Sequence, residues 1–321
     1  MTDNNNENQT TYSICNPKYV TTDLLKLPNN VSIVCDDGEV LANMELLAVR
    51  SDFFARGFTN PGFIESQEKR LRMAGCSKAA MEAVKAYLYT GEMDFRQLRL
   101  DTLLYVMNVS REILIEEELF IGIETFIKTI MSTSAYCAYV GNQIKPSILP
   151  KSLMLVESFR LDNLMDPLLK LSNTLITDLT MHATRDPSIE AVRRSIKKLN
   201  KKRRRYFQEL KSLPKNIMKN LLLCEVDVNQ SVYRYTVSGV ALWKMSLTRG
   251  RFDLFLAWYV ANEESCSEDD KKEIVQSFNY DHFSGEELVT VVGGSGLLPR
   301  EEVDRMVVER FRKCGCGEAN Q

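Results

Sequence analysis

Apolar and polar residues alternate in two runs near the start of the chain. In "VSIVCDDGEVLA" (31–42), Val31 and Ile33 share one side of a strand, and the alternation resumes at Val40 after "DDG". A period of two predicts strands, and an Asp-Gly pair between two such runs predicts a hairpin turn. "RLRM" (70–73) repeats the pattern. We therefore expect a hairpin and one further strand.

Helical spacing dominates the rest of this region, up to about residue 130. "TTDLLKL" (21–27) predicts a short helix. Ser77 can cap the helix "KAAMEAVKAYLYTG", which Gly91 ends, and Asp101 can cap "TLLYVMNVS" in the same way. A few strands and several short helices indicate a small α+β domain.

Beyond residue 145 the pattern is almost entirely helical. "SLMLVESFRLDNLMDPLLKLSNTLITDL" (152–179) predicts helix with a break at Asp166 and Pro167. Later helices are expected to start at Pro214, at Ser284 and at Pro299, and Ser284 has the capping-box spacing to a glutamate. The pattern predicts an all-helical second domain.

Two segments interrupt this helical pattern. "SVYRYTVSGVALW" (231–243) alternates at Tyr233, Tyr235 and Val237 like a strand, and has no place in a helical domain. Residues 181–205 are polar and strongly charged, and we expect them to form a solvated insertion.

The composition limits the class of protein and the number of domains. The chain has 321 residues, of which 44% are apolar and 26% charged, as is typical of folded proteins and comfortable for two domains. It lacks a run of about 18 apolar residues that would span a membrane. Residues 1–18 are polar without a secretory h-region, so they predict a disordered tail, and residues 316–321 are assigned to a short tail after the second domain. Eight scattered cysteines favour reduced thiols and therefore an intracellular protein.

The net charge of −2 hides a strongly basic run at 193–205. The run holds nine basic and no acidic residues, so the rest of the chain carries −11. One interpretation is a solvated, extended segment, and the other is a nuclear-import signal or an anion-binding patch. Nucleic-acid binding is disfavoured, because Tyr206 and Phe207 follow the charges and do not interleave with them. The basic residues are Arg193, Arg194, Lys197, Lys198, Lys201, Lys202, Arg203, Arg204 and Arg205.

Catalytic patterns are weak in this sequence. His182 and His282, the two histidines, lie in polar stretches typical of loops and helix caps. "CGCG" (314–317) supplies a C-x-C pair without the further ligands of a zinc site. "VVGGSGLLP" lacks the ending and spacing of a phosphate loop. We expect a protein without enzymatic activity, metal or cofactor.

Five sequence segments of the first region follow one another in the order typical of a BTB/POZ domain, and the region resembles such a domain, with expected bounds of 19–130. These segments are "DGEVLANMELLAVRSDFF", "FFARGF", "FIES", "AYLYTGEM" and "LLYVMNVSREILIEEEL". Residues 131–315 resemble, less closely, the BACK domain that follows BTB in Kelch-like proteins, through "SLPKNIMKNLLL" and "FDLFLAWYV" with Trp258. We expect no Kelch repeats within these 321 residues.

The resemblance implies an intracellular protein–protein interaction module that dimerises through its first helix. The family's aspartate before the first strand is Asn30 here, and its Ala-His-Lys triplet is Ala42, Asn43 and Met44. Both charged members of the pocket at the dimer interface are therefore neutral, whereas the loss of only one would leave a buried charge unpaired. The expected interface residues are Leu24, Leu25, Leu27, Asn30 and Met44.

Many such domains bind a cullin-3 scaffold and act as substrate adaptors of a ubiquitin ligase. The binding loop of those members carries a hydrophobic residue, any residue and then glutamate, a pattern that Phe63, Ile64 and Glu65 fit. An alternative is that Phe63 or Ile64 packs back onto its own domain. The other functional reading is a nuclear scaffold or transcriptional regulator without ligase activity, which the basic run favours. We expect a cytoplasmic protein, with a nuclear location as the alternative, and a substrate protein that the sequence does not name.

Overall fold

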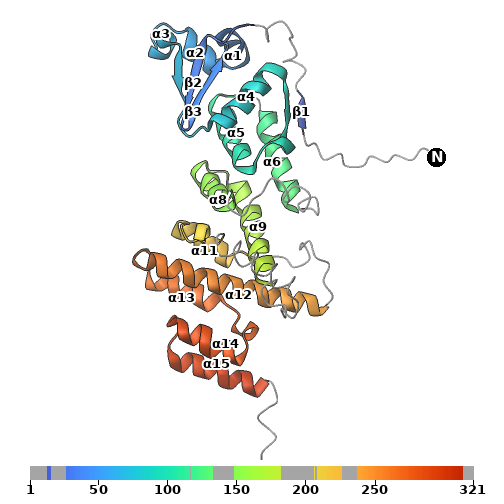
Figure 1. Cartoon of the computed structure of the whole chain (residues 1–321), viewed down its shortest axis with the longest axis vertical. Coiled ribbons are helices and arrows are strands. Elements are labelled where there is room, and N and C mark those ends of the chain that lie inside the picture. Colours follow the sequence, from blue (N-terminus) through green and yellow to red (C-terminus); the bar gives the residue numbers. More distant parts are fainter. Residues whose placement is uncertain are drawn as a thin grey trace, which may run out of the picture. The chain divides into compact units, whose positions relative to one another are not determined.

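The computed structural model describes residues 13–15, 27–115, 117–132, 148–181, 206, 208–225 and 237–313. They belong to two compact units, Met1–Pro167 and Leu168–Gln321. Figure 1 shows that the strands gather in the first unit, coloured blue to green, and that the second is built from helices. None of the described helices is long and apolar enough to cross a membrane.

A three-stranded mixed sheet lies in the first unit, in the order β3-β2-β4. The strands β2 (Val31–Cys35) and β3 (Gly38–Ala42) pair antiparallel across a two-residue turn, and β4 (Arg70–Arg72) pairs parallel to β2. The inward residues Ile33 and Val40 are fully buried. The predicted hairpin and further strand are therefore confirmed.

A second, two-stranded sheet pairs β1 (Ser13–Cys15) antiparallel with β5 (Glu92–Asp94), with Ile14 opposite Met93. The strand β1 lies inside the predicted tail 1–18, so that expectation is wrong for these three residues. A strand of three residues is too short to show a period of its own. Its pairing partner also lies far along the chain, so no local signal predicts it.

Local capping signals set several helix ends. Ser77 accepts a hydrogen bond from the amide of Ala80 (3.3 Å), and Gly91 ends that helix with a left-handed φ of 76°, as predicted. Asp101 is not a cap, because the N-cap is Arg99 and Asp101 lies buried inside the first turn. The helices of this unit are α1 (Met44–Arg50), α2 (Asp52–Thr59), α3 (Ile64–Glu68), α4 (Lys78–Thr90), α5 (Leu100–Glu112), α6 (Glu117–Ser132) and α8 (Ile148–Ser158).

Helix α8 packs against α5 and belongs to the same compact unit. The rings of Tyr105 and Phe159 meet edge to face with centroids 5.4 Å apart. Arg111 donates a hydrogen bond to the carbonyl oxygen of Phe159 (2.6 Å). Helix α5 is buried along nearly its whole length, and α8, whose Leu153 and Val156 are fully buried, packs against it.

The predicted break at Asp166 and Pro167 is wrong, because α9 (Asp162–Met181) runs through both residues. The chain instead turns at Arg160, which has a left-handed φ of 53°, and the amide of Leu161 bonds back to the carbonyl oxygen of Val156 (2.9 Å). A proline so close to the start of a helix costs one backbone hydrogen bond, which the packing of the buried leucines after it offsets.

The second unit contains only helices among its described residues, which confirms the predicted helical region. Its core includes Trp258, whose indole nitrogen donates to the carbonyl oxygen of Leu213 (3.0 Å). The predicted capping box at Ser284 and Glu287 is present. The helices are α11 (Lys215–Leu223), α12 (Val237–Asn262), α13 (Glu268–Ser277), α14 (Gly285–Glu287) and α15 (Arg300–Lys313).

The expected strand at 231–243 is wrong from Val237 onward, because residues 237–243 form the first turns of α12. A short apolar run does not distinguish a strand from a helix by period alone. Residues 231–236 and most of the charged insertion, 182–205, lie outside the described residues.

Candidate protein-interaction site

Phe63 stands at the end of a tight turn between α2 and α3. Its amide donates to the carbonyl oxygen of Asn60 (3.1 Å), and the amide of Gly62 donates to Asn60 Oδ1 (3.0 Å). Gln67 reaches back from α3 to the carbonyl oxygen of Pro61 (3.2 Å). Asparagine, proline and glycine thus each serve the turn, as expected from their preferences.

The apolar residues before and after this turn differ in exposure. Phe54 and Phe58 on α2 are 0% and 1% exposed, and their rings stack with centroids 6.1 Å apart. Phe63 is 47% exposed and Ile64 is 62% exposed. The two rings on α2 already anchor it to the core, so neither Phe63 nor Ile64 is needed as a buried anchor of this segment.

Glu65 lies in the first turn of α3, where the exposed amides of a helix favour a negative charge. The side chain is half-buried, and in the part of the chain that the structure describes it forms no hydrogen bond or ion pair. The carboxylate therefore remains available to a partner or to the loop itself. Together, the three residues present two apolar side chains beside one anionic acceptor.

Lys69 fixes the far end of this segment. It terminates α3 with a left-handed φ of 53°, and its amide donates to the carbonyl oxygen of Glu65. Its own carbonyl oxygen accepts from the amide of Ser32 on β2 (3.0 Å). The exposed pair is thus carried on a segment held by a turn at one end and by the sheet at the other.

The residues expected at a dimer interface are only partly described. Leu24 and Leu25 lie outside the described residues, while Leu27 is 40% exposed. Asn30 and Met44 are brought together, since Asn30 Oδ1 accepts from the amide of Met44 (2.8 Å).

A charged side chain, that of Glu45, lies next to the neutral Asn30 and Met44. Asn30 Nδ2 donates to Glu45 Oε2 (2.9 Å) and Oε1 (3.2 Å). The pKa of the Glu45 carboxyl is lowered, first by a hydrogen bond from its own amide and then by that from Asn30. A partner that covers Asn30 must also accommodate this carboxylate.

Asn43, noted above only as a departure from the Ala-His-Lys triplet, has a structural role. It is 2% exposed; its Oδ1 accepts from the amide of Leu46 (2.9 Å), and its Nδ2 donates to the carbonyl oxygen of Pro28 (2.8 Å). Its amide donates to the hydroxyl of Tyr89 (2.7 Å). An asparagine directly before an apolar helix is an N-cap signal, which would have identified it.

All nine basic residues of 193–205 lie outside the described residues. Tyr206, next to the run, is fully buried, and its hydroxyl donates to the carbonyl oxygen of Ser172 (3.4 Å). Burial raises the pKa of the Tyr206 phenol. A buried ring is not a base-stacking platform, so Tyr206 does not extend the basic run as a nucleic-acid surface.

Of the two histidines, His282 lies in the described ranges and His182 lies outside them. No group of three or more His, Cys, Asp or Glu side chains in the described ranges could hold a metal ion. His282 Nδ1 lies 2.8 Å from Thr248 Oγ1, a contact between a short 3₁₀ turn and α12.

Residues 24–129 match the BTB/POZ domain family. The match covers β2 to β5 and helices α1 to α5, together with most of α6, and therefore includes the exposed Phe63 and Ile64. The search of curated proteins gives no match. A BTB/POZ domain, which is a protein–protein interaction module, thus occupies residues 24–129 of this chain.

Proposed function

We propose that the protein is a dimeric substrate adaptor for a cullin-3 type ubiquitin ligase, and that Phe63, Ile64 and Glu65 contact the cullin. The observation that carries this proposal is the exposure of both Phe63 and Ile64 on a segment fixed at its two ends. Large apolar side chains held in solvent gain free energy only when another surface covers them.

The fixed geometry of the segment favours binding. Ordering a flexible loop costs conformational entropy on association, and a loop already held in shape avoids much of that cost. The turn at Asn60 and the bond between Lys69 and Ser32 provide this order before any partner arrives. A rigid aromatic next to a branched aliphatic side chain is the kind of anchor that dominates interface energetics.

The remaining parts of the chain supply the other requirements of an adaptor. BTB/POZ domains commonly form homodimers, and dimerisation would place two cullin-binding loops on one particle. We propose that the helical second unit is a BACK-like domain of the Kelch-like type and that it recruits the substrate protein.

Binding to the purified N-terminal domain of cullin-3 tests the proposal directly. Titration calorimetry with the full chain should give saturable binding at micromolar or lower concentration. With full-length cullin-3, the ring-box subunit, the ubiquitin-activating and ubiquitin-conjugating enzymes, ubiquitin and ATP, ubiquitin transfer should depend on the chain. A parent protein that does not bind the cullin domain would contradict the proposal.

A second candidate function is a nuclear BTB scaffold or transcriptional regulator without ligase activity. The basic run at 193–205 favours it. This function predicts that the run moves a fluorescent reporter into the nucleus and that the full chain co-purifies with chromatin proteins in place of cullin and ring-box subunits. A reporter that stays in the cytoplasm would remove its main support.

A further inference from the structure

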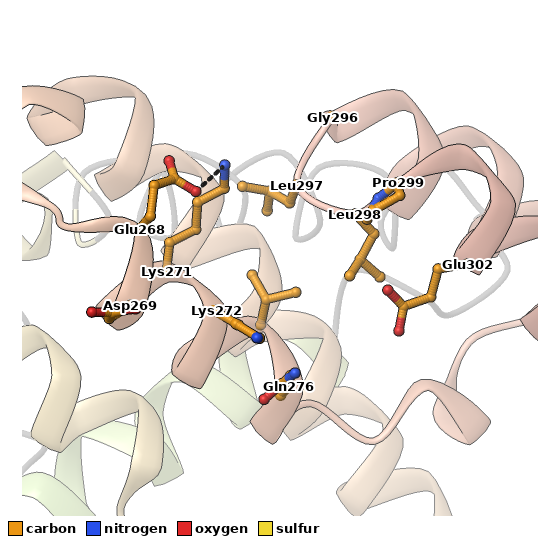
Figure 2. Close-up of a pocket in the computed structure, with 11 residues that line it drawn as sticks. Glu268, Asp269, Lys271, Lys272, Gln276, Gly296, Leu297, Leu298, Pro299 and Glu302 are labelled. Carbon is orange, nitrogen blue, oxygen red and sulfur yellow. Dashed lines mark hydrogen bonds and ion pairs between the residues drawn. The ribbon is translucent and has the colours of Figure 1, made fainter.

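A hollow of about 540 Å³ opens in the second unit between α13 and the turn that leads into α15. Figure 2 shows its two sides. The side chains of Lys271, Lys272 and Gln276 lie on the α13 side, and those of Leu297, Leu298 and Glu302 lie on the other. This volume is in the range of sites that bind small ligands or the side chains of a peptide.

The hollow has an apolar floor and a polar rim. Val275 and Leu297 are almost fully buried, and Leu298 and Pro299 continue the apolar surface toward solvent. Gly296, at the mouth, has a left-handed φ of 68°, and a Cβ there would meet no atom within 4 Å. An open mouth over an apolar floor can take one large side chain from a partner.

The charges on the rim are not equally available. Lys271 Nζ forms an ion pair with Glu268 (3.5 Å) and lies 5.3 Å above the ring of Tyr259. Three carboxylates, those of Glu268, Asp269 and Glu302, stand against two ammonium groups, so the lining is acidic overall.

Glu302 is the carboxylate on the same side of the hollow as the apolar Leu297 and Leu298. It lies beside Leu298 at the edge of the hollow (Figure 2). Its ion pair with Arg305 is 3.5 Å long, and the Arg305 side chain is 74% exposed, so that pair is weak. The negative charge of Glu302 also contributes, after burial, to the raised pKa of the Tyr280 phenol, which donates to the carbonyl oxygen of Val275 (2.7 Å) beneath the floor.

We propose that this hollow binds a short segment of a partner protein that presents one aliphatic or aromatic side chain next to a lysine or arginine. The apolar side chain covers Val275, Leu297 and Leu298, and the basic residue pairs with Glu302. Lys272 and Gln276 on the opposite rim donate hydrogen bonds to carbonyl oxygens of the segment. The role of this site in recruiting a substrate rests on the proposed function. Its ability to bind a peptide rests only on the geometry of the hollow.

Selection from a phage-displayed library of random 12-residue peptides, with the full chain as bait, tests the site. The selected peptides should share an apolar residue adjacent to Lys or Arg. One of them, synthesised with a fluorescent label, is then titrated by anisotropy against the parent and three variants. Leu298→Asp and Glu302→Lys should each weaken binding at least about tenfold. Asp304→Lys makes the same charge change on the same helix outside the hollow and should change binding less than about twofold.

A charge exchange makes the test specific. A peptide whose basic residue is replaced by glutamate should bind the Glu302→Lys variant better than it binds the parent. The proposal is overturned if no peptide is selected, if the selected peptides are acidic, or if Leu298→Asp and Glu302→Lys leave binding unchanged while circular dichroism confirms their fold. Cullin binding, measured on the same preparations, reports on the other unit, so loss of one activity is distinguishable from loss of the other.

Discussion

Asp101 of α5 and Lys151 of α8 form an ion pair of 3.4 Å between helices 50 residues apart in the sequence. Arg99 also binds the Asp101 carboxylate, through its Nη2 at 3.1 Å. Asp101 is 6% exposed, so its charge is balanced by these two cations and not by water. This contact joins α8 to the BTB/POZ domain as part of the same unit.

We therefore expect α8 to stabilise the first unit. A fragment of residues 1–167 should unfold at a temperature at least about 5 °C higher than a fragment of residues 1–132. The shorter fragment lacks Leu153 and Val156, whose burial contributes about 1.5–3 kcal/mol each. Thermal unfolding followed by circular dichroism provides the measurement. Equal midpoints would show that α8 adds no stability.

Phe63→Ala should weaken cullin-3 binding by about 2 kcal/mol or more, which is over tenfold in affinity. The folding stability should barely change, because Phe63 is exposed. Leu41→Ala removes another exposed apolar side chain, on β3, and is the matched control. A buried phenylalanine would instead lose about 3–5 kcal/mol of folding stability. Unchanged binding by Phe63→Ala would remove this residue from the interface.

The full chain should be a homodimer at micromolar concentration. Light scattering should give twice the monomer mass for the parent. Substituting Leu24 and Leu25 together by aspartate should give the monomer mass, because the interface would then bury charges without partners. Leu41→Asp, at an exposed position on β3, should leave the dimer intact. A monomeric parent would refute the prediction.

Arg251 should be a stability determinant of the second unit. Its guanidinium donates to Asn173 Oδ1 (2.8 Å) and to the carbonyl oxygen of Cys224, and so ties α9 and the end of α11 to α12. Burial lowers its pKa to about 10. Arg251→Met keeps an apolar stem but loses both bonds, and should cost about 1.5–3 kcal/mol in urea unfolding.

Arg251→Lys separates shape from charge at this position. Lysine keeps the charge but lacks the planar fork, so this variant should also be destabilised. Full stability of the lysine variant would mean that the charge alone suffices.

Asp270 should make the stability of the second unit depend on pH. Hydrogen bonds from Ser267 and from Lys215 (2.9 Å) lower its carboxyl pKa below the ordinary 3.8, and Lys219 adds to the effect. The stability from Asp270 is therefore present above the ordinary pKa and is lost as pH falls through the lower, folded-state value. Asp270→Asn should lower the melting temperature at pH 7, and its difference from the parent should shrink below about pH 4.

The neighbouring Asp269 supplies the control for this titration. It is exposed on the same helical turn, and Asp269→Asn should change the melting temperature at pH 7 only slightly. A difference for Asp270→Asn that grows toward acid would contradict the assignment.

Sequence reasoning succeeded where the signal is local. The capping box at Ser284 and Glu287 and the limits of α4 at Ser77 and Gly91 depend on hydrogen bonds and φ values within a few residues. The exposed Phe63 was also found from its neighbours, because a turn followed by a large apolar residue is unusual in a loop.

Prediction from the sequence failed where contacts between residues far apart in the chain determine the local structure. Asp101 looks like a cap, yet it lies inside the first turn of α5, where it forms a half-buried ion pair with Lys151 of α8. Pro167 looks like a helix start, yet the chain turns earlier, at Arg160. The hollow beside Glu302 has no sequence signature, since its two sides come from segments that are twenty or more residues apart.

The parallel pairing of β4 with β2 has a consequence for the order of folding. The β2–β3 hairpin closes across two residues, whereas β4 reaches β2 only after the crossover that contains α1, α2 and α3. Long-range pairing of this kind is slow, because loop-closure entropy is lost before the contacts form. The bond from Ser32 to Lys69 that fixes the Phe63 segment therefore forms late. A nascent or damaged chain without this pairing would not present the segment in its bound shape, so recognition at Phe63 would select completed copies of the protein.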